Sequence, residues 1–187
     1  TGSTLSGIRE DLGMKIRTFS LSAGLALLLL AANVIAGPIE DAEAVLEAGN
    51  FDGAIKLLRP VAESGDAKAQ FLLGKIYRIG DTHAVKTMLT ALSGGKGNAA
   101  EGIKWLLKAA NQNLPEAQYE VGLAYQLGQG VPKDEQQSRI WYQRAIDLWR
   151  RRAEEGADSA AMTEIGFLYE IGRGVAKDEA EALRWYE

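Results

Sequence analysis

Apolar residues recur along this chain in short blocks that have the spacing of amphipathic helices. Four blocks combine small, apolar and aromatic residues, at 54–58, 102–107, 138–142 and 182–186. Between them lie blocks rich in Ala, Gly and Tyr, marked by Gly74, Gly122 and Gly166. The alternation predicts helix pairs, each with an A helix followed by a B helix. We expect such pairs to stack on their neighbours.

The second B block is written again further along the chain. The segment Gly122–Asp134 recurs as Gly166–Asp178, and Gly74–Gly80 is an earlier partial copy. Trp105 and Trp141 lie 36 residues apart, whereas the first two B-helix glycines lie 48 residues apart. A base unit of about 36 residues with two insertions explains these spacings. The first insertion is a loop-like segment at 81–98, and the second lengthens the third A helix through 146–152 by about two turns.

The recurring residues predict how the helices pack. We expect the three glycines to allow close approach of an A helix, Gly128 and Gly172 to end B helices, and Asp134 and Asp178 to cap the next A helix. The predicted repeat-packing residues are Gly74, Gly122, Gly166, Ala69, Ala117, Ala161, Tyr77, Tyr125, Tyr169, Trp105, Trp141 and Trp185.

The tryptophans have two interpretations. Their fixed register favours packing between A and B helices, and the alternative is a platform that stacks carbohydrate or peptide. Trp149 lies outside the register, within the inserted turns, so we expect it to be partly exposed. The neighbouring segment 150–152 is interpreted as a solvated basic face, with contact to an acidic partner or anionic lipid as the alternative.

Two sequence motifs of the B blocks point to a known family. The second B block contains A-Q-x-x-V-G at 117–122 with Tyr125 three residues later, and a G-x-G-V-x-K-D turn follows both this block and its later copy. Together they resemble the SEL-one-like repeat family, which is related to the tetratricopeptide repeat. The resemblance covers about 50–187 and implies an all-α solenoid of antiparallel helix pairs. Residues 67–80 depart from it because Gly80 is not followed by the G-x-G-V turn.

The amino end predicts an export signal. Met14, Lys15 and Arg17 give a basic start, residues 21–32 are apolar, and a cleavage site follows at Ala36/Gly37. The signal peptide is therefore predicted at 14–36, with a periplasmic or secreted product that has no membrane contact after cleavage. Residues 1–13 are interpreted as lying before the natural start at Met14. They come either from translation of the sequence upstream of that start or from cloning. The alternative is an uncleaved membrane anchor.

The remaining boundaries follow the repeats. We expect an N-terminal capping helix at 37–49, repeat 1 with its insertion at 50–98, repeat 2 at 99–134, and repeat 3 with its long A helix at 135–178. Residues 179–187 are interpreted as the start of a truncated fourth repeat, whose A helix would lack its partner.

Net charge and cysteine content exclude several classes of function. The net charge of −4 is unlike that of a general nucleic-acid binder, which carries a basic footprint. The chain has no cysteine, which excludes disulfides, zinc–thiolate sites and thiol catalysis. Some cysteine-rich members of the resembled family are linked to β-lactam binding, and the absence of cysteine weakens that inheritance here.

Catalytic motifs are weak. His83 has no second His or Cys to form a metal or catalytic site, so it is interpreted as a solvated loop residue. Ser93 and Lys96 match S-x-x-K by chance, because the other motifs of that enzyme class are missing. The segment 94–97 lacks the Ser or Thr of a phosphate loop. We therefore predict no cofactor and no metal.

Positively charged residues recur at equivalent positions of the predicted A helices. Cations recur on the A helices, and the resemblance implies that these helices line the concave face of the solenoid. The candidate partner-binding residues are Lys56, Lys104, Lys108, Arg144 and Arg184. A basic groove suited to an acidic or extended peptide is the prediction, and a chance distribution of surface charge is the alternative.

The sequence thus leads to three hypotheses. The first is an exported, non-enzymatic scaffold that binds another protein in the bacterial envelope or outside the cell, with roles implied by the resemblance such as restraining an envelope sensor. The second is an enzyme that acts on cell-wall or β-lactam material. The third is an anchored envelope component that retains residues 14–36.

Overall fold

The computed structural model describes residues 37–79, 98–156 and 158–187. The predicted signal peptide, His83, and the segment from Ser93 to Lys96 lie outside these residues. The described part is helical throughout and contains no strand. Its helices are α2 (Pro38–Glu47), α3 (Phe51–Glu63), α4 (Ala67–Ile79), α6 (Asn98–Ala110), α7 (Pro115–Leu127), α8 (Glu135–Gly156), α9 (Ser159–Ile171) and α10 (Glu179–Tyr186).

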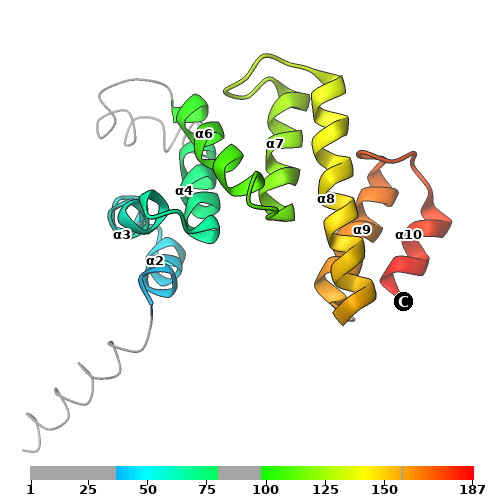
Figure 1. The fold of residues 1–187 in the computed structure, drawn as a ribbon, viewed down its shortest axis with the longest axis horizontal. Helices are drawn as coiled ribbons and strands as arrows, with labels where there is room; N and C mark the ends of the chain where they lie inside the picture. Colours follow the sequence, from blue (N-terminus) through cyan, green and yellow to red (C-terminus); the bar gives the residue numbers. More distant parts are fainter. Residues whose placement is uncertain (1–36, 80–97, 157) are drawn as a thin grey trace, which may run out of the picture. The chain divides into compact units, whose positions relative to one another are not determined.

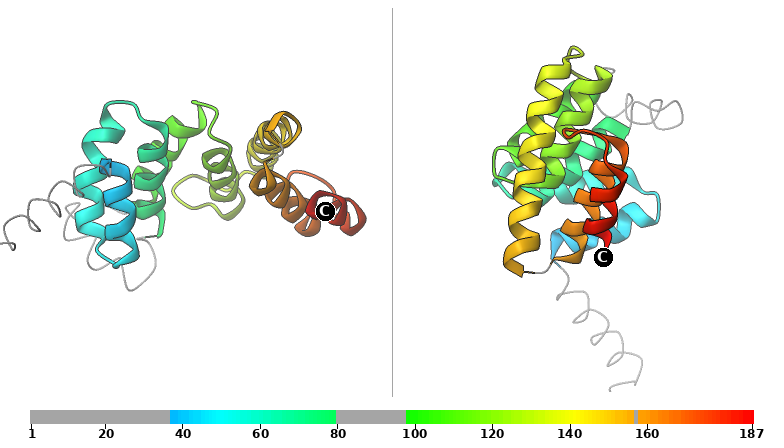
Figure 2. Two further views of the ribbon diagram at one scale, coloured as in Figure 1. Left: turned by 90° about the horizontal axis from the view of Figure 1, so that it is seen from below. Right: turned by 90° about the vertical axis from the view of Figure 1, so that its right-hand side faces the viewer.

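The main contacts join each helix to the next one along the chain, as Figure 1 shows for the labelled helices. Figures 1 and 2 both place α9 beside α10, which are consecutive and in contact. Contacts between sequence neighbours are the mark of a repeat array, in which each unit packs only on adjacent units. The prediction of an all-α solenoid of helix pairs is confirmed.

The helix ends follow the turn chemistry expected from the sequence. Gly128 and Gly172 end α7 and α9 in the left-handed conformation, with φ of 69° and 68°. Asp134 Oδ1 accepts a hydrogen bond from the Gln137 amide at 2.9 Å, and Asp178 Oδ1 accepts one from the Glu181 amide at 3.0 Å. Both sets of caps were predicted correctly, because glycine is the residue most tolerant of the left-handed conformation and aspartate is a strong N-cap.

The core is divided into three clusters, and each is completed by a tryptophan from the next A helix. Trp105 on α6 joins the cluster of α2, α3 and α4. Trp141 on α8 joins the cluster of α6 and α7. Trp185 on α10 packs against the cluster of α8 and α9. The tryptophans therefore link successive units.

Candidate binding surface

The three B-helix glycines lie against the A helix that follows them. A Cβ on Gly74 would stand 2.7 Å from Leu106 Cγ of α6. A Cβ on Gly122 would stand 2.8 Å from the ring of Tyr142 on α8, and one on Gly166 would stand 2.6 Å from the ring of Tyr186 on α10. Such distances are too short for a side chain, so each glycine lets the next unit approach closely.

The other predicted packing residues are also placed between helices. The alanines at the start of the B helices are buried, and so are Tyr77, Trp105 and Trp141, whereas Tyr125, Tyr169 and Trp185 are half-buried. Trp105 and Trp141 are only 6% and 7% exposed. That burial leaves little ring surface for a stacked ligand.

The G-x-G turns contact the A helix of their own helix pair. Gly130 lies against the carbonyl of Ala99 at the start of α6, and Gly174 lies against Tyr142 on α8. Gly174 has a φ of 73°, and a Cβ there would stand 2.5 Å from Tyr142 Cβ. Each turn therefore packs directly on the A helix that precedes it.

The five predicted A-helix cations do not form one free surface. Lys104 pairs with Glu101 at 3.3 Å and Arg184 with Glu181 at 2.8 Å, both within one helix. Among the described residues, no acidic side chain pairs with Lys56. The structure thus neutralises some of these cations locally.

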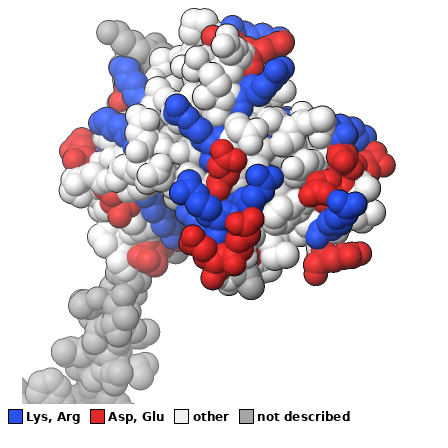
Figure 3. Space-filling model, turned by 45° about the vertical axis from the view of Figure 1, so that its right-hand side comes forward, with Lys and Arg blue, Asp and Glu red and all other residues white. Residues whose placement is uncertain are grey.

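Lys108 and Arg144, the other two of these cations, lie over aromatic rings instead. The Lys108 ammonium is 4.0 Å from the centre of the Trp105 ring, and the Arg144 guanidinium is 4.6 Å from that of Trp141. Both contacts lie within the distance of a cation–π interaction. Figure 3 shows acidic and basic side chains intermingled on the face in view, without a field of one sign.

One expectation about the lengthened helix α8 was wrong. Trp149 is 2% exposed, not partly exposed, because α8 extends along α9 and the Tyr119 ring lies 6.2 Å from it. Of the cations at 150–152, Arg151 and Arg152 are exposed, as a solvated face requires, and Arg150 is half-buried. Arg152 pairs with Glu116 of α7 at 3.0 Å, and Arg150 lies 6.0 Å from the Trp185 ring.

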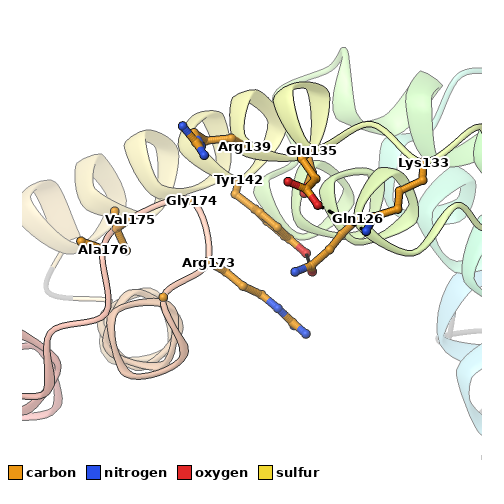
Figure 4. A pocket seen from close by; sticks show the side chains of 11 residues that line it. Gln126, Lys133, Glu135, Arg139, Tyr142, Arg173, Gly174, Val175 and Ala176 are labelled. Atoms are coloured by element: carbon orange, nitrogen blue, oxygen red, sulfur yellow. Dashed lines mark hydrogen bonds and ion pairs between the residues drawn. The ribbon is translucent and has the colours of Figure 1, made fainter.

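A polar recess of about 540 Å³ lies where the α9–α10 turn meets α8. We call it the arginine recess. Figure 4 shows its side chains: they come from the end of α7, the α7–α8 turn, the first turns of α8 and the α9–α10 turn. Its lining residues are Gln126, Lys133, Glu135, Ser138, Arg139, Tyr142, Gly172, Arg173, Gly174, Val175 and Ala176.

The floor of the arginine recess is fixed by Tyr142. Its hydroxyl donates to Gln126 Oε1 at 2.9 Å, and the side chain is 2% exposed. Burial raises the pKa of Tyr142 to about 12, against an opposing effect of the nearby Arg173 cation. The hydroxyl therefore stays protonated at neutral pH and acts as a hydrogen-bond donor.

The charge of the recess is mainly positive. Lys133 pairs with Glu135 at 3.3 Å, which leaves Arg139 and Arg173. Arg173 donates to the Tyr119 hydroxyl, and within the described ranges no carboxylate pairs with Arg139. In Figure 4 the two guanidinium groups do not point toward each other.

Sequence reasoning missed Arg139 and Arg173. It looked for cations that recur at one repeat position, and Arg139 corresponds to Leu183 and Arg173 to Gln129 in the neighbouring copies. No recurrence could mark either residue. The sequence does not show that the α9–α10 turn contacts α8, and this contact is what brings Arg139 and Arg173 to one recess.

The described residues form neither a metal site nor a membrane span. Within 37–79, 98–156 and 158–187, no group of three or more His, Cys, Asp or Glu side chains could hold a metal ion. None of the described helices combines the length and the apolar character needed to cross a bilayer.

Comparison with known proteins identifies the repeat. The model of the Sel1 repeat matches residues 67–87, 88–114, 115–148 and 159–187, which together make up more than half of the chain. These matches include α4, α6, α7, α9 and α10 and most of α8. Among curated proteins, none matches the chain.

Two crystal structures are similar to it. A Sel1 repeat protein from Oxalobacter formigenes is 25% identical, with a TM-score of 0.46, over 81% of this chain and 66% of that chain. A protective antigen from uropathogenic Escherichia coli strains, which displays an SLR fold, is 25% identical with a TM-score of 0.25, over 71% of this chain and 39% of that chain. This chain therefore spans less than two-thirds of either protein.

The repeat matches carry the assignment, and they agree with the helix pairs, the glycine contacts and the G-x-G turns described above. The resemblance inferred from the sequence is confirmed. This chain belongs to the Sel1 repeat family, whose helical scaffolds commonly mediate protein–protein interactions.

Proposed function

We propose that this protein is an exported, non-enzymatic scaffold that binds an acidic segment of another protein, in the bacterial envelope or outside the cell. The observation that carries the proposal is the arginine recess, a mainly cationic surface in a chain of net charge −4. It lies at a junction between repeats, where the helices and the turn hold its walls in place. A preformed surface costs little ordering on binding.

The binding mode follows from the two arginines. Arg139 and Arg173 lie at different sides of the recess, and each can donate two hydrogen bonds to one carboxylate. Tyr142 supplies the buried floor between them. An extended segment with two or more acidic residues matches this arrangement.

Export is supported by the sequence pattern of residues 14–36. We expect the protein purified from its native cells to begin at Gly37, as measured by intact mass spectrometry and N-terminal peptide mapping. A mature chain that still contains residues 14–36 would favour the anchored alternative.

Binding is tested with a fluorescein-labelled hexaglutamate peptide, amidated at its C-terminus, by fluorescence anisotropy on the full chain. The neutral hexaglutamine peptide is the comparison. We expect Arg139→Leu combined with Arg173→Gln to weaken hexaglutamate binding at least about tenfold, because two charge-assisted contacts are lost. Each replacement is the residue that the neighbouring repeat carries at the same position.

The matched control is Lys68→Leu combined with Arg152→Gln, which removes two cations outside the recess that pair with Glu43 of α2 and Glu116 of α7. We expect it to bind hexaglutamate as the wild type does. Equal loss in the control would show that diffuse surface charge attracts the peptide and would overturn the proposed site.

The enzymatic alternative is tested directly with a fluorescent penicillin. We expect no covalent labelling of the full chain. Stoichiometric labelling that survives denaturation would contradict the scaffold proposal.

A further inference from the structure

Helix α2 presents an exposed face of one charge. Four of its ten residues are acidic and none is basic. Glu43 is turned inward and pairs with Lys68 of α4 at 3.0 Å. Glu40, Ala44 and Glu47 are exposed, and their spacing of four and three residues places them on one side of the helix. We call these three residues the α2 acidic face.

Helix α8 presents the opposite charge with the same spacing. Arg144, Leu148 and Arg151 are also separated by four and three residues, so they share one side of α8. Both arginines are exposed and Leu148 is half-buried. The three side chains line one recess of about 330 Å³. We call them the α8 basic face.

Both arginines of the α8 basic face are held in place on the surface. The Arg144 guanidinium lies 4.6 Å from the centre of the Trp141 ring, and Arg151 Nε donates to the carbonyl of Asp147 at 3.3 Å. Among the described residues, no carboxylate forms an ion pair with either arginine. Side chains that are already ordered lose less freedom when a partner binds.

The lengthening of α8 creates this pair of cations. Lys108 on α6 corresponds to Arg144, counted from the aligned tryptophans. By the same count, Arg151 corresponds to Pro115, the first residue of α7. Because α6 ends at Ala110, it carries only the first of the two cations. Within the described ranges, the basic face is therefore a feature of α8 and does not recur on α6.

We propose that the α2 acidic face of one copy of this protein binds the α8 basic face of a second copy, with the two helices antiparallel. Glu47 then faces Arg144, Glu40 faces Arg151, and Ala44 faces the part of α8 between the two arginines. The charges on each helix are separated by two turns, about 10 Å. Equal spacing lets both ion pairs form together, and the small alanine between them lets the helices approach.

The antiparallel orientation follows from Asp147, the acidic residue between the two arginines. In a parallel arrangement Asp147 would face Glu43 of α2, and two carboxylates would repel each other. In the antiparallel arrangement Asp147 faces the uncharged Ala44. Its own Oδ1 accepts a hydrogen bond from Gln143 Nε2 at 3.3 Å within α8.

The two faces lie on different helices of one chain, so the contact joins unlike surfaces of identical copies. Such a contact can add further copies as well as form a pair. Exposed ion pairs are individually weak, and the net charge of −4 opposes association. We therefore expect an association that is weak, that rises with protein concentration and that is sensitive to salt.

The proposal is tested by sedimentation velocity on the full chain at low salt, over a range of protein concentrations. We expect the mean mass to rise with concentration and to return to that of one copy in about 0.5 M NaCl, because salt screens exposed charges. A wild-type chain that stays monomeric at every concentration, or an association that salt does not weaken, would overturn the pairing.

Charge reversal identifies the two faces. We expect Glu40→Arg combined with Glu47→Arg to weaken self-association at least about tenfold, because like charges then face each other. The same loss is expected for Arg144→Glu combined with Arg151→Glu. An equal mixture of the two variants should associate again, since the reversed α2 face of one meets the reversed α8 face of the other. No regain in the mixture of folded variants would contradict the proposal.

A neutral variant covers the case in which a charge-reversed variant does not fold, as judged by circular dichroism. Glu40→Gln combined with Glu47→Gln removes the attraction, and self-association retained in this variant would overturn the proposal. The matched control is Glu179→Arg combined with Glu187→Arg, which makes the same change in net charge at exposed residues outside both faces. We expect it to associate at least as strongly as the wild type. A loss equal to that of the reversed α2 face would show that net charge alone is responsible and would count against the pairing.

This association is separable from the function proposed for the arginine recess. Glu40→Gln combined with Glu47→Gln leaves both recess arginines in place, so we expect hexaglutamate binding to be unchanged in it. Arg139→Leu combined with Arg173→Gln leaves both faces intact, so we expect it to self-associate as the wild type does. Loss of self-association in that variant would show that α2 binds the arginine recess instead, and would overturn the pairing with α8.

Discussion

Gly122→Ala measures how tightly successive repeats are packed. The added methyl group would stand 2.8 Å and 2.9 Å from two ring carbons of Tyr142. That ring cannot easily move, because it is 2% exposed and its hydroxyl is bonded to Gln126. Overpacking of this kind costs about 1–3 kcal/mol, and we expect the upper part of that range here.

The helix itself gains from the same substitution. Alanine is more favourable than glycine inside a helix by ~1 kcal/mol. The net expectation for Gly122→Ala is therefore a loss of about 1–2 kcal/mol in the free energy of unfolding. Gly156→Ala is the matched control, because a Cβ at Gly156 has nothing within 4 Å.

The assay is urea unfolding followed by circular dichroism in the far ultraviolet, with the slope of the transition checked for each variant. We expect Gly122→Ala to unfold at lower urea than the wild type and Gly156→Ala to unfold at equal or higher urea. Gly122→Ala should cost less in a Tyr142→Leu background than in the wild type, because the ring is already removed. A Gly122→Ala protein as stable as Gly156→Ala would refute the packing argument.

Three further predictions concern two buried side chains and one partly desolvated carboxylate. Trp149→Ala should lower the free energy of unfolding by about 3–5 kcal/mol, as for a buried aromatic residue, measured by urea unfolding; a loss below about 1 kcal/mol would restore the exposed interpretation. Glu120→Gln should cost about 1–3 kcal/mol by thermal or urea unfolding, because it weakens the partly buried pair with Arg78 that joins α4 to α7 at 2.5 Å; a cost that disappears in high salt would contradict the role of burial. Burial, with a smaller effect of Glu116, raises the pKa of Glu164, so its contribution to stability falls as pH rises from 4.5 through the folded-state pKa. Glu164→Gln should therefore be more stable than the wild type at about pH 7 and equal to it at about pH 3, and a difference that is constant with pH would contradict this.

The sequence predicted what recurs and missed what differs between copies. Helix pairs, glycine contacts and turn caps repeat with the period, so one alignment reveals them. Trp149 was assigned to solvent because it has no counterpart in the other repeats, although the inserted turns that carry it gain a partner helix in α9.

The candidate sites depend on residues and contacts that the copies do not share. Arg139 faces the turn that follows α9, and Arg151 has no counterpart on α6. The second difference arises because α8 is longer than α6, so that it continues past the position at which α6 ends. The spacing of residues along the chain does not show which side chains from neighbouring helices meet at the changed position. That depends on the three-dimensional packing of α7 and α8.

Each core cluster is completed by a tryptophan of the following repeat, and this sets the order in which the repeats can fold. Whether the chain emerges during synthesis or during export, its amino end comes first, so α2, α3 and α4 appear before Trp105, and α6 and α7 appear before Trp141. The interior of each unit can therefore close only after the first helix of its successor has emerged. Because segments that emerge first fold first, we expect assembly to advance from the amino end, one helix behind the emerging chain.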